Sequence, residues 1–393
     1  MMEYRLDELF DLQMGKTPSR NNPEYWNSKD HKWISIGDLS KCGKYILDTK
    51  EYLSDKAVQE SGISCIPANT VIMSFKLSIG KTAITKEPIY SNEAIMSFRD
   101  KHFVELLPDY IFYMFTGKDW EAGTNKAVMG KTLNKATLSA IKVSIHPISE
   151  QRKIVAVLDK ANSIIEDRQR ELTRLDELIK ARFVEMFGDP ELNPKKWPIE
   201  TLGDVLSVEP QNGLYKPQSD YVQDGTGIPI LRIDAFYDGK VTDLSGLKRL
   251  NCTETERSRY LLVENDIVIN RVNSLEYLGK CAWITGLIEP TVFESNMMRF
   301  HVDESRINPC YITRLLCSPF IYKQILNRAK KAVNQASINQ RDVQNLKILI
   351  PPVELQKQYA AFVAQVDKSK VAVQKSLDET QLLFNSLMQK YFG

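Results

Sequence analysis

The sequence predicts a mixed α/β (α+β) protein made of two similar domains, each followed by a long helix. Three observations predict it: a heptad repeat over about residues 150–187, a copy of that repeat 205 positions later, and short β-branched runs in the segment before each copy. An unbroken heptad repeat indicates a coiled coil, and an internal duplication favours a molecule with pseudo-twofold symmetry.

The two heptad segments match position by position. The seam of the first contains Leu158, Ala161, Ile165, Arg168, Leu172, Leu175, Ile179, Arg182 and Met186. The seam of the second contains Val363, Val366, Lys370, Val373, Leu377, Thr380, Phe384, Leu387 and Tyr391. A helix of roughly 38 residues spans about 57 Å and cannot cover its seam alone. We therefore expect the two helices to pack on each other as a coiled coil, with two separate surface helices as the alternative.

The helices divide the chain into four parts. We expect an N-terminal globular domain at 1–148, a central helix at 149–188, a second globular domain at 189–351 and a final helix at 352–393. Gly188 and the prolines after it end the first helix. Residues 71–73 and 267–269 are expected strands, and 110–115 and 311–316 are expected short helices. The sequence leaves the order of the strands open.

Composition and motifs exclude several classes of protein. The chain is 43% hydrophobic and 26% charged, and no run of 18 apolar residues could span a membrane. Its six cysteines are scattered singly, which is typical of reduced thiols in a cytoplasmic protein. Three Gly-Lys-Thr tripeptides lack the earlier glycine of a phosphate-binding loop, and no motif of a methyltransferase, hydrolase or metal site occurs. We expect no catalysis, cofactor or metal in this chain.

Positive charge is segregated although the net charge is only +2. Residues 122–149 contain four lysines and no acid, and residues 305–341 contain seven basic residues and no acid. These stretches occupy matching places before the two long helices. Such segregation is typical of a surface that binds a polyanion, and solvated loops are the alternative interpretation.

At this point the chain resembles the specificity (S, HsdS) subunit of type I DNA restriction–modification systems. The family's N-terminal pattern is matched by Gly-Lys-Thr-Pro-Ser at 15–19, Tyr25-Trp26, Trp33-Ile34 and Asp38. Its strand and following loop are matched at 72–80 and at 269–279. Its Pro-x-x-Glu-Gln motif is matched at 147–151, whereas Pro-Val-Glu-Leu-Gln at 352–356 departs by one inserted-looking residue. The second domain lacks the Gly-x-Thr-Pro signature and has Gly213 roughly in its place.

The resemblance implies a non-catalytic subunit whose two target recognition domains each read one half of a bipartite double-stranded DNA target. The long helices would form an antiparallel two-helix coiled coil that sets the spacing of the half-sites and docks two methyltransferase (M) subunits. S-adenosylmethionine would bind to those partners, and ATP and Mg to restriction (R) subunits where restriction occurs. A non-catalytic coiled-coil scaffold that binds protein is the alternative function, and a fused restriction–methylation enzyme is a second one, disfavoured by the missing motifs.

The candidate site residues follow from the repeated loops and the acid-free stretches. We expect DNA contacts from basic and amide side chains: Lys76, Lys81, Lys126, Lys131, Arg232, Arg271, Asn273, Lys280, Lys330, Lys331 and Arg341. Among them Arg232 is the possible base reader, and Lys126, Lys131, Lys330, Lys331 and Arg341 are phosphate contacts. A two-helix coil leaves apolar residues half covered, so we expect Ile164, Leu178, Phe183 and Leu383 to bind the methyltransferase subunits.

Overall fold

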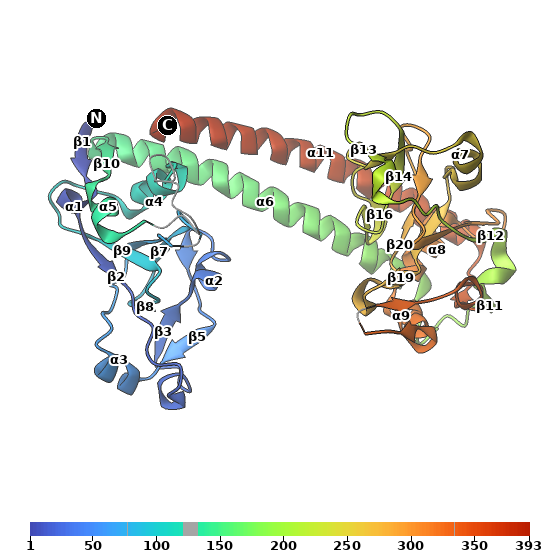
Figure 1. Cartoon of the computed structure of the whole chain (residues 1–393), viewed down its shortest axis with the longest axis horizontal. Coiled ribbons are helices and arrows are strands. Elements are labelled where there is room, and N and C mark those ends of the chain that lie inside the picture. Colours follow the sequence, from blue (N-terminus) through green and yellow to red (C-terminus); the bar gives the residue numbers. More distant parts are fainter. Residues whose placement is uncertain (77, 121–132, 334) are drawn as a thin grey trace. The chain divides into compact units, whose positions relative to one another are not determined.

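The computed structural model describes residues 1–76, 78–120, 133–333 and 335–393. The chain forms two compact units, Met1–Arg170 with Val373–Gly393 (unit 1) and Glu171–Ala372 (unit 2). Both long helices, α6 (Ile148–Phe187) and α11 (Val353–Phe392), are 40 residues long, and each contributes one part to each unit (Figure 1).

Among its described residues, the globular part of unit 1 contains three sheets. The largest has five strands in the order β2 (Phe10–Met14), β9 (Ile95–Asp100), β6 (Val71–Ser74), β7 (Thr82–Thr85) and β4 (Tyr45–Ile46). The second has the order β5 (Glu51–Leu53), β3 (His31–Ile34) and β8 (Tyr90–Ser91), and the third pairs β1 (Met2–Arg5) with β10 (Lys142–Ile145). The five-stranded sheet is antiparallel except for the parallel pair of β4 and β7.

Unit 2 repeats this topology. Its largest sheet has the order β12 (Leu206–Asn212), β22 (Met297–Val302), β18 (Ile267–Asn270), β20 (Cys281–Trp283), β16 (Gly239–Val241) and β15 (Phe236–Tyr237). A second sheet has the order β13 (Tyr221–Val222), β17 (Arg249–Leu250), β14 (Ile228–Leu231) and β21 (Val292–Phe293), and β11 (Ile199–Thr201) pairs with β25 (Lys347–Leu349). Because β16 and β20 are again the parallel pair of the largest sheet, the duplication extends to strand order and direction.

The helices of the globular parts are short. In unit 1 they are α1 (Leu6–Leu9), η1 (Pro23–Tyr25), α2 (Ile36–Leu39), α3 (Asp55–Ser61), α4 (Pro108–Gly117) and α5 (Lys135–Ala140). In unit 2 they are η2 (Leu202–Val205), η3 (Gln218–Asp220), α7 (Glu254–Tyr260), η4 (Leu275–Tyr277), α8 (Pro309–Leu316), α9 (Pro319–Arg328) and α10 (Gln340–Gln344). Both α4 and α8 begin with proline, whose fixed φ suits the first helical position, so the two expected helices are confirmed.

The two long helices pack against each other within unit 2. Lys370 pairs with Asp176, and the Tyr359 ring lies 5.6 Å from the Phe183 ring. Residues later in α6 therefore contact residues earlier in α11, which shows that the helices run antiparallel. The predicted seam is confirmed here by the burial of Ile179 and Met186 on α6 and of Val363 and Val366 on α11.

In unit 1 the start of α6 packs together with the end of α11. Ile154 and Leu158 are buried in the same core as Met388, and Phe384, Leu387 and Tyr391 lie half-buried around it. This core also covers one face of the five-stranded sheet and α4. Since early α6 meets late α11, the antiparallel direction found in unit 2 holds in unit 1 as well.

Two glycines occupy the same place in the two units. A Cβ on Gly15 would lie 2.2 Å from the carbonyl oxygen of Ser91, and one on Gly213 would lie 2.2 Å from that of Glu294. No side chain could be tolerated there without moving a backbone, which explains why both are glycine. Gly213 is thus the counterpart of Gly15 although the rest of the Gly-x-Thr-Pro signature is absent from unit 2.

Candidate nucleic-acid interface

A small three-stranded sheet in unit 2 gathers most of the predicted basic residues of that half. Its order is β19 (Val272–Asn273), β24 (Ala336–Ser337) and β23 (Lys330–Lys331). Asn273 pairs with Ala336, and Lys331 pairs with the same residue from the other side. Arg271 precedes β19, and its carbonyl accepts a 3.0 Å hydrogen bond from Ile338. The sheet therefore joins the loop after β18 to the lysine-rich segment before α10.

The positive charge on this sheet is available to a ligand. Lys330, Lys331 and Arg341 are exposed. Within the described part of the chain, none of these three side chains forms an ion pair or hydrogen bond with a protein group. Cations that no carboxylate neutralises are suited to phosphate contacts, and the β23–β24 sheet with α10 presents three of them.

The Arg271 side chain forms a hydrogen bond within the protein. One of its terminal nitrogens donates a 3.1 Å hydrogen bond to the carbonyl of Ser295, and the residue is half-buried. This bond fixes the guanidinium beside the basic sheet. Its role in DNA contact stays a prediction.

Arg232 is held in an internal network. It donates a 3.2 Å hydrogen bond to the hydroxyl of Tyr221, and it lies 3.7 Å from both Glu294 and Asp234. Burial raises the pKa of the Glu294 carboxyl, which also accepts a 2.7 Å hydrogen bond from the backbone of Ile233. To read a base, Arg232 would have to leave these partners, so its role as a base reader also stays a prediction.

The ammonium group of Lys280 lies close to two aromatic rings. Its ammonium lies 4.1 Å from the centre of the Tyr237 ring and 3.9 Å from that of Tyr277. Tyr237 is 57% exposed, Tyr277 is 37% exposed and Lys280 is half-buried, so both rings and the cation reach the surface. A basic group between exposed aromatics can contact a phosphate or stack on a base. The sequence did not single out these two tyrosines.

Lys81 holds the matching position in unit 1. Gly80 donates its N–H to the carbonyl of Ser74 at 2.9 Å, and Gly279 donates its own to Asn270 at 3.0 Å. Both glycines have positive φ, 87° and 76°, so both turns require glycine. Lys81 is exposed and Lys76 is half-buried, with its ammonium 5.2 Å from the Phe75 ring. Lys126 and Lys131 lie outside the described residues.

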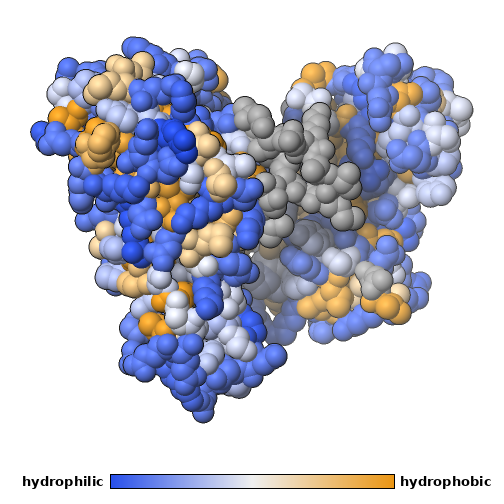
Figure 2. Space-filling model, turned by 60° about the vertical axis from the view of Figure 1, so that its left-hand side comes forward, coloured by the Kyte–Doolittle hydropathy of each residue, from blue (hydrophilic) through white to orange (hydrophobic). Residues whose placement is uncertain are grey.

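Exposed apolar residues occur along the long helices. Leu178 is 46% exposed and Leu383 is 55% exposed, while Ile164 is half-buried. Figure 2 shows that hydrophobic residues on the face in view form small groups among hydrophilic ones. Exposed leucines that are scattered singly are normal on a protein surface, so the role of these residues in binding a methyltransferase subunit stays a prediction.

The prediction that Phe183 binds a methyltransferase subunit is corrected by its burial. It is only 5% exposed and stacks on Tyr311 of α8, with ring centres 5.6 Å apart. The expectation that this residue is half covered is wrong, because it considered the helix pair alone. The globular part of unit 2 covers the side of α6 that a free coiled coil would expose.

Two buried glutamines join each globular part to its long helix. The Gln151 amide accepts a 3.0 Å hydrogen bond from the N–H of Leu107 and donates to the carbonyls of Glu105 and His146 at 3.0 and 2.9 Å. Gln356 makes the equivalent three bonds in unit 2. The Pro-x-x-Glu-Gln motif marked these residues, but only as a family signature. Its second copy keeps the distance from proline to glutamine, so no residue is inserted.

Ion pairs add a second connection in each unit. In unit 1, Lys44 pairs with Asp109 of α4 at 2.7 Å and with Asp159 of α6. Burial alone would raise the pKa of Asp109, but hydrogen bonds from Lys44 and Tyr45 hold it below its usual value. The sheet is thereby fixed to both helices.

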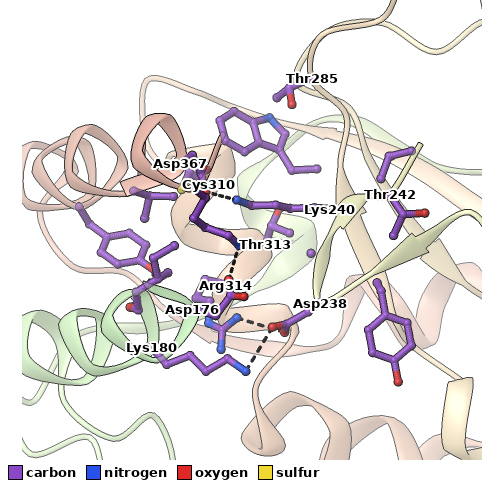
Figure 3. A pocket seen from close by; sticks show the side chains of 18 of the residues that line it. Asp176, Lys180, Asp238, Lys240, Thr242, Thr285, Cys310, Thr313, Arg314 and Asp367 are labelled. Carbon is purple, nitrogen blue, oxygen red and sulfur yellow. Dashed lines mark hydrogen bonds and ion pairs between the residues drawn. The ribbon is translucent and has the colours of Figure 1, made fainter. Parts of the chain in front are cut away.

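In unit 2 the corresponding region contains a cavity of about 480 Å³. Asp238, in the turn between β15 and β16, pairs with Arg314 of α8 at 3.1 Å and with Lys180 of α6 at 3.2 Å, and Lys240 pairs with Asp367 of α11 (Figure 3). Burial alone would raise the pKa of Asp238, but Arg314 and Lys180 hold it below its usual value. The acidic and basic residues that line this cavity pair with one another, so these ion pairs hold the sheet of unit 2 against α6, α8 and α11.

The described residues contain no group of three or more His, Cys, Asp or Glu side chains that could hold a metal ion. In that same part of the chain, every helix is too short or too polar to cross a bilayer.

Comparison with known proteins matches both halves of the chain to one family. The sequence model of the type I restriction modification DNA specificity domain matches residues 1–174 and again 194–380. A type I restriction enzyme specificity subunit (MjaIX) of Methanocaldococcus jannaschii is 25% identical over 98% of this chain and 91% of its own length. The EcoKI specificity subunit of Escherichia coli is 26% identical over 65% of this chain and 57% of its own length.

Solved structures share the fold. The crystal structure of an S subunit from M. genitalium superposes with a TM-score of 0.59 at 13% identity, covering 100% of this chain and 96% of that one. A structure from a study of the assembly and conformational transition of the type I system gives a TM-score of 0.60 at 17% identity, covering 100% and 97%. At these identities the likeness concerns the fold alone.

Proposed function

The chain belongs to the type I restriction modification DNA specificity domain family, and on that premise we propose that it is the sequence-specific DNA-binding subunit of a type I restriction–modification complex. Each globular part reads one half of a bipartite double-stranded target. The observation that carries this proposal is the match of the family to both halves of the chain, together with their shared strand order.

The long helices supply the spacing between the two half-sites in this proposal. At 1.5 Å per residue, a helix of 40 residues is about 60 Å long, which exceeds one turn of DNA at roughly 34–36 Å. Two modules anchored on such helices can read sequences separated by a gap that neither contacts.

Catalysis and cofactors belong to partner subunits in this proposal. Two methyltransferase subunits bind S-adenosylmethionine and methylate adenine, and restriction subunits use ATP and Mg where restriction occurs. This chain itself binds DNA in the cytoplasm and contributes no reacting group. The charged sheet of unit 2 and the repeated turns supply contacts, which is consistent with a role in recognition.

Methylation of defined DNA tests the function. The chain is co-purified with its methyltransferase subunits, incubated with DNA and labelled S-adenosylmethionine, and the modified adenines are mapped by single-molecule sequencing. We expect a two-part motif with a fixed gap, and no methyl transfer by this chain alone. Transfer by the chain alone would contradict the proposal. Partner binding without any DNA binding, measured by mobility shift, would favour a protein scaffold instead.

Exposed leucines on the long helices test the docking surface. Because Leu178 and Leu383 are half exposed and apolar, Leu178→Asp and Leu383→Asp should each weaken binding of the methyltransferase subunit by about 10-fold. Affinity is measured by titration of the labelled chain. Leu47→Asp is the matched control, since Leu47 is a 75% exposed leucine that does not belong to either long helix. Equal affinities for all four proteins would show that the subunit docks elsewhere.

A further inference from the structure

Two thiols lie in contact in the interior of unit 2. The sulfur of Cys281, on β20, is 3.6 Å from the sulfur of Cys317, which follows α8. Cys281 is 1% exposed, whereas Cys317 is half-buried. The other four cysteines, all within the described residues, form no such pair with one another. The contact joins residues 36 positions apart in the sequence, so the tertiary fold creates it.

We propose that Cys281 and Cys317 are a reversible oxidation site, at which a peroxide or a small disulfide converts the two thiols into an intramolecular disulfide. This site is independent of the DNA-binding function proposed above. The sulfur atoms need to approach by roughly 1.6 Å to reach the disulfide bond length of about 2.05 Å. Rotation of the two side chains can supply such a shift.

The surroundings give the two thiols different chemistry. The contact with the Cys281 sulfur and the nearby charge of Arg314 lower the pKa of the Cys317 thiol. The same contact, together with burial, raises the pKa of Cys281. Because Cys317 is half-buried whereas Cys281 is 1% exposed, Cys317 is the sulfur that an oxidant can reach and attacks it as the thiolate, and Cys281 is the thiol that resolves the product.

The reaction balances with hydrogen peroxide as the oxidant. The Cys317 thiolate attacks one peroxide oxygen, the O–O bond breaks, and a sulfenic acid and hydroxide form. The Cys281 sulfur then attacks the Cys317 sulfur, the S–O bond breaks, and the departing hydroxide takes the Cys281 proton to form water. The first hydroxide takes the proton that Cys317 released on ionising, so two thiols lose two electrons in total and peroxide is reduced to two water molecules. A small disulfide gives the same bond through a mixed disulfide with Cys317, releasing two small thiols.

The position of the bond gives it a structural consequence. Arg314 belongs to α8 and pairs with Asp238, and Asp238 also pairs with Lys180 of α6 (Figure 3). Gly239, beside Asp238, also lies close to this helix end, since a Cβ there would be 3.3 Å from the Thr313 methyl group and 3.6 Å from the Cys317 sulfur. A bond from β20 to the end of α8 would therefore lock the sheet to the helix that contacts α6.

Peptide mapping tests the proposal. The full chain, alone and with its methyltransferase subunits, is treated with hydrogen peroxide or oxidised glutathione, alkylated, digested without reductant and analysed by mass spectrometry. We expect a linked peptide containing Cys281 and Cys317 that disappears on reduction. In Cys281→Ser, Cys317 should instead be trapped by dimedone as a sulfenic acid. Cys310→Ser, a matched control for a buried thiol of α8, should still form the bond.

A second measurement keeps the test independent of peptide recovery. A disulfide closing a long loop restricts the unfolded chain, so oxidation should raise the melting temperature of unit 2 by about 5 °C or more. Cys281→Ser and Cys317→Ser should show no such rise, and Cys310→Ser should show it in full. Absence of the linked peptide in the folded wild-type chain, or an equal rise in all three variants, would overturn the proposal.

Discussion

Replacing Gln356 by alanine lowers the free energy of unfolding by about 3–5 kcal/mol. The residue is fully buried, and its amide accepts a 2.7 Å hydrogen bond from the N–H of Asn308 and donates to the carbonyls of Pro351 and Arg306 at 2.7 and 3.4 Å. Alanine leaves all three backbone groups without their partner. Each unsatisfied buried group costs about 1–3 kcal/mol, and water entering the space recovers part of the loss. Urea unfolding of the full chain measures the effect.

Gln365→Ala is the matched control, because Gln365 lies on the exposed side of the same helix. It should change stability by no more than about 0.5 kcal/mol. Gln151→Ala should destabilise unit 1 as Gln356→Ala destabilises unit 2, since both glutamines make the same set of bonds. A Gln356→Ala protein as stable as the control would show that these bonds do not hold the helix to the globular part.

Gln356→Glu adds a test through pH. A neutral carboxyl can still donate to one of the facing carbonyls, whereas a carboxylate cannot, so folding should raise the pKa of the introduced group. Its stabilising protonated form is then fully present below the unfolded pKa of about 4.3 and is lost as pH rises through the folded pKa. The stability deficit relative to the wild type should therefore grow from pH 4 to pH 8. A deficit independent of pH would argue against the proposed hydrogen bonds.

Local periodicity explains which parts of the fold could be predicted. Patterns of residues close together in the sequence predict the heptad positions of α6 and α11 and the strands β6 and β18, and the structure confirms them. Strand order depends on pairing between distant segments, such as β4 with β7, for which one sequence carries no local signal. Phe183 was misjudged for the same reason, since Tyr311, which covers it, is more than a hundred residues away.

The candidate site was predictable in part. The loops after β6 and β18 and the lysine-rich segment were found because charge segregation is visible in the sequence. Their assembly into the β19–β24–β23 sheet was not, and neither were the rings of Tyr237 and Tyr277 beside Lys280. Aromatic residues far apart in sequence reveal such a role only once the fold brings them together.

Neutralising the basic sheet of unit 2 should weaken DNA binding by about 100-fold at 0.15 M salt. A phosphate contact contributes about 0.9 to the slope of log affinity against log salt, and at this salt concentration each such contact is worth roughly a factor of five. Lys330→Gln, Lys331→Gln and Arg341→Gln combined should therefore lower the slope by about 2.7. Fluorescence anisotropy of the methyltransferase complex on labelled duplex DNA, titrated at several salt concentrations, measures both quantities.

The matched control and the type of DNA distinguish phosphate contact from base readout. Lys357→Gln removes a lysine that pairs with Glu354 on the long helix, and it should leave the salt slope unchanged. If the three residues contact phosphates, target and non-target duplexes should lose affinity by the same factor, because phosphates carry no sequence information. A loss confined to the target would instead assign one of the three to base readout. An unchanged slope for the triple variant would place the DNA on another face of unit 2, because exposed cations in contact with phosphates must release counterions when they bind.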